Sequence, residues 1–192
     1  ADSLELRERH DEAIEMLRRA AQVDPENNEL RGRLAKTFLA RGDLQSAGEY
    51  ITVETAGGDP KLLMTAAEIQ LRAGQMEAGM ALARQLLEED PARREDIAMM
   101  GWNIGPHAPE AGFAVVELSA DAAVAKNDWA SAAAALQEFV TRVPSSIPAL
   151  MRLVEICVDG GLEATMYTAQ AQLADAYIAM GAVSEARFIA ED

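Results

Sequence analysis

The apolar residues of this chain recur at fixed distances from a turn residue. A glycine or asparagine is followed two positions later by an apolar residue and five positions later by a small one. Glycine and asparagine accept the left-handed backbone that ends a helix, and the apolar residue opens the next helix over the bend. The pattern therefore predicts helical hairpins at five places: Gly42/Leu44/Ala47, Gly74/Met76/Gly79, Asn127/Trp129/Ala132, Gly160/Leu162/Thr165 and Gly181/Val183/Ala186.

A second small residue precedes the turn by seven positions in four of these hairpins. We expect it to face the small residue of the second helix, so that the two helix axes approach closely. These residues are Ala35, Ala67, Ala120 and Ala174. Prolines 60, 91 and 144 then close three of the units, where proline stops one helix and fits the first turn of the next. Residues 9–25 end in the same way at Pro25, so we interpret them as a repeat that lacks its front half.

At these residues the sequence resembles the tetratricopeptide repeat family, whose unit is a helix-turn-helix of about 34 residues. The best match is residues 28–60, with Leu34, Ala35 and Phe38 in the first helix and Ala47 and Ile51 in the second. Residues 60–93 and 113–146 match more loosely, and no unit has the tryptophan of the family pattern. The resemblance implies an all-α, right-handed solenoid of helical hairpins, with about ten to eleven antiparallel helices.

The tripeptide Arg41-Gly42-Asp43 is better explained as a hairpin turn than as a cell-adhesion ligand. The same position reads Ala-Gly-Gln and Lys-Asn-Asp in the sister repeats. A shared place in the repeat therefore accounts for this tripeptide without any ligand role.

The spacing between turns is irregular in two places. Turns 74 and 127 are 53 residues apart, which leaves room for an extra helix near 92–104 and a second helix at about 109–126. Three helices between two turns would reverse the inner and outer helices downstream. We therefore expect an N-terminal block at 1–93, an irregular insertion at 94–112 and a C-terminal block at 113–192. Residues 162–180, between the last two turns, have room for only one helix, which must serve two repeats.

The charge of the chain limits the partners that it can bind. The formal net charge is −15, which repels phosphate backbones and argues against nucleic acid and anionic membranes as partners. No apolar run approaches the ~18 residues of a membrane span, and no signal peptide is visible. Because the sequence starts without methionine and stops in a helical pattern, we expect it to be a segment of a longer chain.

The resemblance implies a concave groove, lined by the first helix of each repeat, that binds a peptide or a helix. The candidate groove residues lie six positions before each turn. They are Lys36, Glu68, Asp121 and Asp175, joined by Glu155 if the double glycine at 160 and 161 shifts the register by one. An acidic stripe would favour a basic or amphipathic segment of another protein. The alternative is an ordinary solvated face of an acidic protein.

Basic residues precede this stripe. Arg31, Arg33 and Lys36 form a cluster that could complement a carboxylate of the partner. Some relatives clamp a terminal carboxylate with lysines and asparagines on successive first helices, but Met64 and Glu68 occupy the matching positions here. The clamp is therefore not expected.

Trp102 is a further candidate for partner binding, because tryptophan is over-represented at interfaces. Its alternative is a place in the core, which we also expect for Trp129. The sequence predicts no metal site or cofactor, since His10 and His107 lack partners at ligand spacing. A lone cysteine, Cys157, lies in an apolar run typical of a buried thiol.

No catalytic motif occurs in the sequence, so we expect a protein-binding scaffold and not an enzyme. Two alternatives stay open at this stage. The chain could be a regulatory or substrate-recruiting arm of a larger enzyme, or a homo-oligomer that assembles through the ends of its solenoid.

Overall fold

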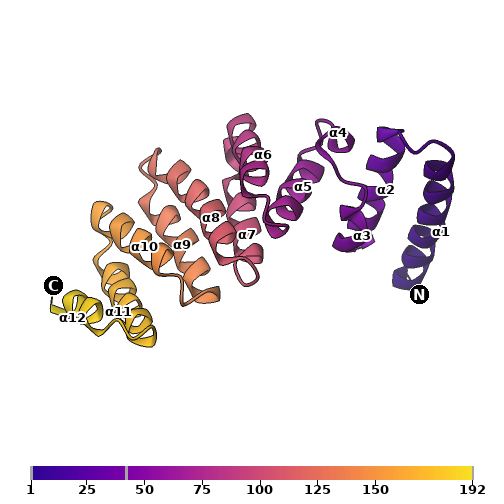
Figure 1. Ribbon diagram of the computed structural model, residues 1–192. Helices are drawn as coiled ribbons and strands as arrows, with labels where there is room; N and C mark the ends of the chain where they lie inside the picture. The colour runs from indigo at the N-terminus through magenta and orange to yellow at the C-terminus, as the bar shows by residue number, and fades with distance from the viewer. Residues whose placement is uncertain (1, 42, 192) are drawn as a thin grey trace. The chain divides into compact units, whose positions relative to one another are not determined.

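Helices account for most of the backbone described. The structure, a computed structural model, describes residues 2–41 and 43–191, and in these ranges it contains twelve α-helices, one 3-10 helix and no strand (Figure 1). The helices are α1 (Asp2–Val23), α2 (Asn28–Arg41), α3 (Leu44–Gly48), α4 (Val53–Ala56), α5 (Pro60–Arg72), α6 (Met76–Glu89), η1 (Pro91–Arg93), α7 (Arg94–Ile104), α8 (Pro109–Val124), α9 (Trp129–Arg142), α10 (Ile147–Asp159), α11 (Glu163–Ala179) and α12 (Val183–Glu191). The predicted all-α class is confirmed.

The chain divides into two compact units, residues 1–70 (unit 1) and residues 71–192 (unit 2). The boundary between them falls within α5. The predicted blocks, 1–93 and 113–192 around an insertion at 94–112, follow the break in repeat spacing instead, and that division stays a prediction.

The predicted turns have the left-handed backbone at three positions. Gly74, Asn127 and Gly181 have φ values of 79°, 56° and 79°. Gly42 lies outside the described residues, but the residues on either side of it, Arg41 and Asp43, make polar contacts with other residues of the chain. Arg41 pairs with Asp11 of α1, and the Asp43 carboxylate accepts a hydrogen bond from the Ser46 N–H, which caps α3. These contacts agree with a hairpin turn.

The prediction for the fourth turn was wrong by one residue. Gly160 has a φ of −84°, whereas Gly161 has a φ of 65°. Gly160 is required for another reason, because a Cβ there would lie 2.6 Å from the Trp129 Cβ. The first glycine therefore permits close packing, and the second permits the backbone turn.

Substitution of Gly161 should separate backbone strain from packing. A Cβ at Gly161 meets no atom within 4 Å, so alanine adds only the cost of a left-handed residue, about 1 kcal/mol. Asparagine should cost less, as Asn127 occupies the same backbone region. Urea denaturation of the two variants measures the difference. Equal stability of Gly161→Ala and the wild type would contradict the left-handed turn.

The small residues of the hairpins are buried where the helices meet. Ala35 and Ala47 are fully buried between α2 and α3, and Ala120 and Ala132 are fully buried between α8 and α9. Ala174 is only half-buried in the last hairpin. Close approach through small side chains is therefore confirmed for the first and third hairpins.

The second helix of residues 28–60 is broken, although this segment matches the repeat pattern best. Helix α3 ends at Gly48, and Ile51 is buried outside any helix. Two reciprocal hydrogen bonds between Thr52 and Thr55 start the next helix, α4. The Thr52 hydroxyl accepts a hydrogen bond from the Thr55 N–H at 3.2 Å, and the Thr52 N–H donates one to the Thr55 hydroxyl at 2.7 Å. These side-chain bonds compete with the continuous helix and begin α4 instead.

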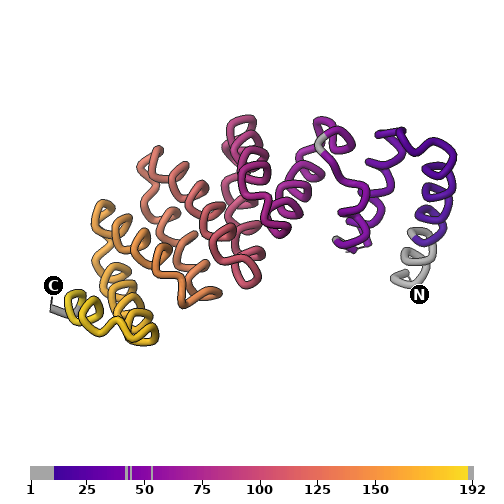
Figure 2. The backbone as a smooth tube through the Cα atoms, in the orientation of Figure 1, coloured from indigo at the N-terminus to yellow at the C-terminus, as the bar shows by residue number. Residues whose placement is uncertain are grey.

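The extra helix expected near 92–104 is present as α7, while the reversal of inner and outer helices stays a prediction. Helix α6 contacts α8, and α8 contacts α10, while α7 contacts α9. Within unit 2, helices α6, α8 and α10 thus form one layer, and α7 and α9 lie in another. The single long helix predicted at 162–180 is α11, and Figure 2 traces the backbone through it into α12.

Three glycines bring α7 and α8 together in unit 2. A Cβ at Gly112 of α8 would lie 2.5 Å from the Gly105 Cα and 2.8 Å from the Gly101 carbonyl oxygen. Gly105 also packs on Phe139 of α9, with 2.6 Å between an added Cβ and the ring Cε2. The sequence pattern indicated only a helix break at Gly105, and it missed this contact.

Candidate functional site

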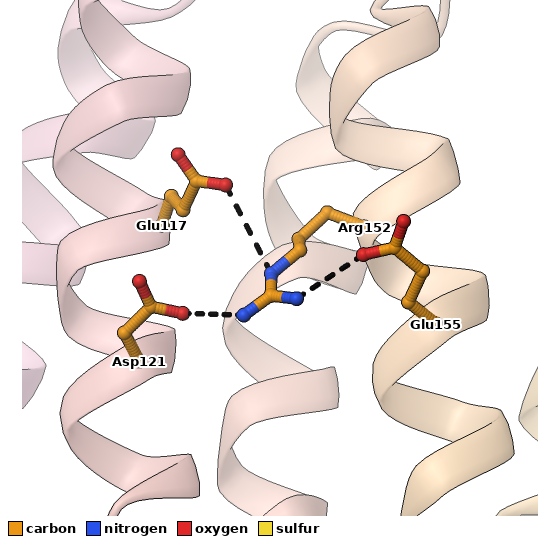
Figure 3. A network of polar contacts seen from close by, with 4 residues as sticks. All are labelled: Glu117, Asp121, Arg152 and Glu155. Atoms are coloured by element: carbon orange, nitrogen blue, oxygen red, sulfur yellow. Dashed lines mark hydrogen bonds and ion pairs between the residues drawn. The ribbon is translucent and has the colours of Figure 1, made fainter.

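Two of the predicted groove residues meet on the layer formed by α8 and α10. Asp121 lies six positions before Asn127, and Glu155 lies six positions before Gly161, so the register shift required for Glu155 is present. Both side chains bind the same guanidinium, that of Arg152 on α10 (Figure 3). The Arg152 Nη2–Asp121 Oδ1 distance is 2.6 Å, and the Nη1–Glu155 Oε2 distance is 3.1 Å.

A third carboxylate, that of Glu117, completes this group of charges. Its Oε1 lies 3.9 Å from the Arg152 Nε, an ion-pair distance that is too long for a hydrogen bond. The Nε is buried and has no hydrogen-bond acceptor among the described residues. We call Glu117, Asp121, Arg152 and Glu155 the acidic face. It carries three formal negative charges against one positive charge.

The electrostatics of the acidic face follow from this imbalance. Burial, and then the neighbouring Asp121 charge, raise the pKa of Glu117, and the attraction of Arg152 offsets them only in part. The hydrogen bond that Arg152 donates to the Asp121 carboxylate raises the pKa of Arg152. The guanidinium stays charged, so one cation is shared by three anions, and a second cation would be attracted to this face.

Sequence reasoning missed Glu117 and Arg152, although a signal for both is present. Glu117 precedes Asp121 by four positions and Arg152 precedes Glu155 by three, spacings that place side chains on one side of a helix. The Glu117/Asp121 pair and the Arg152/Glu155 pair come together because α8 and α10 are neighbours in the fold.

Lys36 and Arg31, two of the candidate residues of unit 1, interact with residues of their own unit. The Lys36 Nζ lies 2.6 Å from the Asp59 Oδ2, and this hydrogen bond is the main cause of the lowered Asp59 pKa. Arg31 is half-buried and is one of the weaker causes of the lowered Glu54 pKa, which is due first to a hydrogen bond with Thr52. Glu68 lies half-buried on α5. These residues belong to unit 1, whereas Asp121 and Glu155 belong to unit 2, and a single stripe that runs through all of them stays a prediction.

Asp175 lies apart from the acidic face. It comes from α11, the helix that follows α10 in the hairpin, and its exposed carboxylate lines a pocket with apolar residues of α9 and α10. Asp175 is therefore not among the carboxylates that pair with Arg152.

Trp102 is placed largely in the core. Its indole N–H donates a hydrogen bond of 2.9 Å to the Ala135 carbonyl, and its ring packs against the buried cluster around Phe139. The Arg142 guanidinium carbon lies 5.9 Å from the ring centroid, which covers part of the remaining face. This placement favours the core interpretation, and Trp129 packs against the same cluster, as predicted.

The described residues contain no group of three or more histidine, cysteine, aspartate or glutamate side chains placed to hold a metal ion. Cys157 is buried, as predicted, and burial raises the pKa of its thiol. Among the helices that the structure describes, none is both long and apolar enough to cross a bilayer.

Two segments of the chain match family models described as tetratricopeptide repeat, residues 6–52 and residues 118–146. Each matched segment contains one of the predicted turns, at 42 and 127. No curated protein matches the sequence.

Several solved structures are similar at low identity. The crystal structure of MamA is 14% identical and has a TM-score of 0.39, with 98% of this chain and 88% of that chain covered. The C-terminal part of a TPR repeat-containing protein from Cytophaga hutchinsonii is 13% identical, with coverages of 98% and 92% and a TM-score of 0.39. A tetratricopeptide repeat protein from Parabacteroides merdae is 15% identical, with coverages of 94% and 84% and a TM-score of 0.37. With TM-scores this low, the fold assignment rests on the helical hairpins and the two repeat matches.

Proposed function

We propose, from the premise that the chain carries tetratricopeptide repeats, that it is a non-catalytic scaffold whose acidic face binds a basic segment of a partner protein. Repeats of this family generally bind other proteins, and stacked repeats present an extended surface for that purpose. The finer assignment, to the acidic face and to a basic partner, is our own.

The observation that carries the proposal is the excess of negative charge on the acidic face. Three carboxylates from two neighbouring helices share one guanidinium, and the Asp121 and Glu155 side chains are both more than half exposed. A lysine or arginine of a partner can therefore reach them without unfolding the site. Attraction between exposed charges acts mainly on the association rate and the orientation of the partner.

A defined peptide tests this proposal. The probe is an amphipathic helical peptide of leucine and lysine, about 18 residues long, with a leucine and glutamate peptide of the same length as its acidic counterpart. We expect the basic peptide alone to bind, and we expect fluorescence anisotropy to show weaker binding as salt concentration rises.

The double variant Asp121→Asn/Glu155→Gln should weaken binding of the basic peptide. Two exposed ion pairs contribute together about 1 kcal/mol, or roughly a fivefold change in affinity. The matched control is Glu88→Gln/Glu89→Gln, which removes the same charge from exposed positions on α6. If the control weakens binding as much as the double variant does, then net charge and not the acidic face attracts the peptide.

We also propose self-association through the C-terminal end of unit 2, as a second role. The large apolar side chains of Ile178, Val183 and Phe188 are between 57% and 70% exposed on α11 and α12. Apolar groups gathered at the end of a repeat array stabilise it when a further helix covers them.

Sedimentation velocity over a range of concentrations tests this second role. We expect the mean sedimentation coefficient to rise with concentration, and the double variant Val183→Ser/Phe188→Ser to remove that rise. A monomer at every concentration in the wild type would exclude the role.

A further inference from the structure

An apolar pocket in unit 2 lies outside the acidic face. It is formed by the end of α9, the loop after it, the start of α10 and the second half of α11, and its volume is about 470 Å³. Val140, Leu150 and Ala176 are buried and form its floor, while the side chain of Met180 stands exposed at its wall. None of these residues belongs to the acidic face.

The space exists because α11 presents small side chains to it. Ala176 and Ala179 lie three positions apart, on one side of the helix, and both line the pocket. A volume of this size lies within the range of about 300–1,000 Å³ found for ligand pockets, so it accommodates a large side chain. Met180 adds a flexible, polarisable wall, which is typical of surfaces that adapt to apolar groups.

Asp175 is the one charged residue of the pocket lining. Its carboxylate is exposed, and no ion pair or hydrogen bond engages it among the described residues. An apolar ligand alone would leave this charge unused. Charge complementarity therefore favours a ligand that places a cation beside its apolar group.

We propose that this pocket binds a partner segment in which a large apolar side chain lies next to a lysine or arginine. The apolar side chain would rest on Val140, Leu150 and Ala176, and the basic side chain would pair with Asp175. The inference is independent of the acidic face, because the pocket is lined by different residues and shares only α10 with it.

Methyl NMR of the whole chain with two small probes tests the inference. The probes are the acetylated amides of Trp-Lys and Trp-Glu, for which we expect dissociation constants of about 1–10 mM. Trp-Lys should shift the methyl signals of Ala176, Ala179 and Met180, and it should bind about three- to fivefold more tightly than Trp-Glu. Asp175→Asn should abolish the difference between the two probes.

A pair of alanine variants locates the binding. Ala179→Leu should fill the pocket and prevent the shifts, whereas Ala164→Leu, at an exposed position near the start of the same helix, should leave them unchanged. Since both alanines are exposed, neither variant should unfold the helix.

Three outcomes would overturn the inference. The first is the absence of shifts at these methyl groups, and the second is equal binding of Trp-Lys and Trp-Glu to the wild type. The third is a concentration-dependent shift of the same signals without any probe in the Val183→Ser/Phe188→Ser background, which would assign the pocket to a second copy of the chain. Shifts confined to α8 would refute the pocket and would still allow binding at the acidic face.

Discussion

Replacing Gly112 with alanine is expected to destabilise unit 2 by about 3 kcal/mol. The added Cβ would lie 2.5 Å from the Gly105 Cα, 2.6 Å from the Gly105 N and 2.8 Å from the Gly101 carbonyl oxygen. All three atoms belong to the backbone of the facing segment, so no side chain can rotate away to relieve the overlap. Helices α7 and α8 would have to move apart, which disturbs the packing of Gly105 on Phe139 as well.

Urea denaturation followed by circular dichroism measures the loss, and hydrogen exchange assigns it to α7 and α8. Gly58→Ala is the matched control, because a Cβ at Gly58 meets no atom within 4 Å and its backbone is not left-handed. The control should change the stability by no more than about 1 kcal/mol. If Gly112→Ala is as mild as the control, α7 and α8 do not pack as closely as described.

Replacing Phe139 with alanine is expected to cost about 3–5 kcal/mol. Phe139 is fully buried, and its ring lies 6.2 Å from that of Phe113. It contacts the layer of α7 through Gly105 and belongs to the same buried cluster as Leu150 and Leu153 of α10. Truncation leaves a cavity where three helices meet, and the surrounding backbone cannot collapse freely into it.

The same substitution at Phe188 provides the comparison. Phe188 is 70% exposed, so Phe188→Ala should change the stability by less than about 0.5 kcal/mol at concentrations where the chain is monomeric. The difference between the two variants isolates the contribution of burial, since the atoms removed are identical. Similar losses in both variants would contradict the position of Phe139 at the centre of unit 2.

The acidic face illustrates how far the pattern of residues could lead. The six-residue offset from each turn selected Asp121 and Glu155, and the structure brings both to Arg152. The same offset selected Asp175, which lies at the apolar pocket instead. Because α11 serves two hairpins, a position counted from its second turn does not share the layer of α8 and α10.

Most of the helices, three left-handed turns and the break in the repeat spacing could be predicted from the local pattern of residues. A helical hairpin requires a left-handed residue such as Asn127 at its turn and a buried small residue such as Ala120 where its helices meet. These residues therefore recur in the sequence at a fixed spacing. The extra helix could be located for the same reason, since helical periodicity is local.

Contacts between side chains of helices distant in the sequence could not be predicted, because they depend on how the helices pack. The contact of Gly112 with Gly105, the sharing of Arg152 by three carboxylates and the pocket beside Asp175 all depend on how neighbouring helices stack. The way helices stack depends on the shape and charge of many residues on each helix face. It therefore cannot be predicted from the spacing of a few residues in the sequence. The close approach of the Thr55 carbonyl oxygen to Gly32 of α2, where an added Cβ would lie 2.7 Å from that oxygen, is likewise a contact between separate helices.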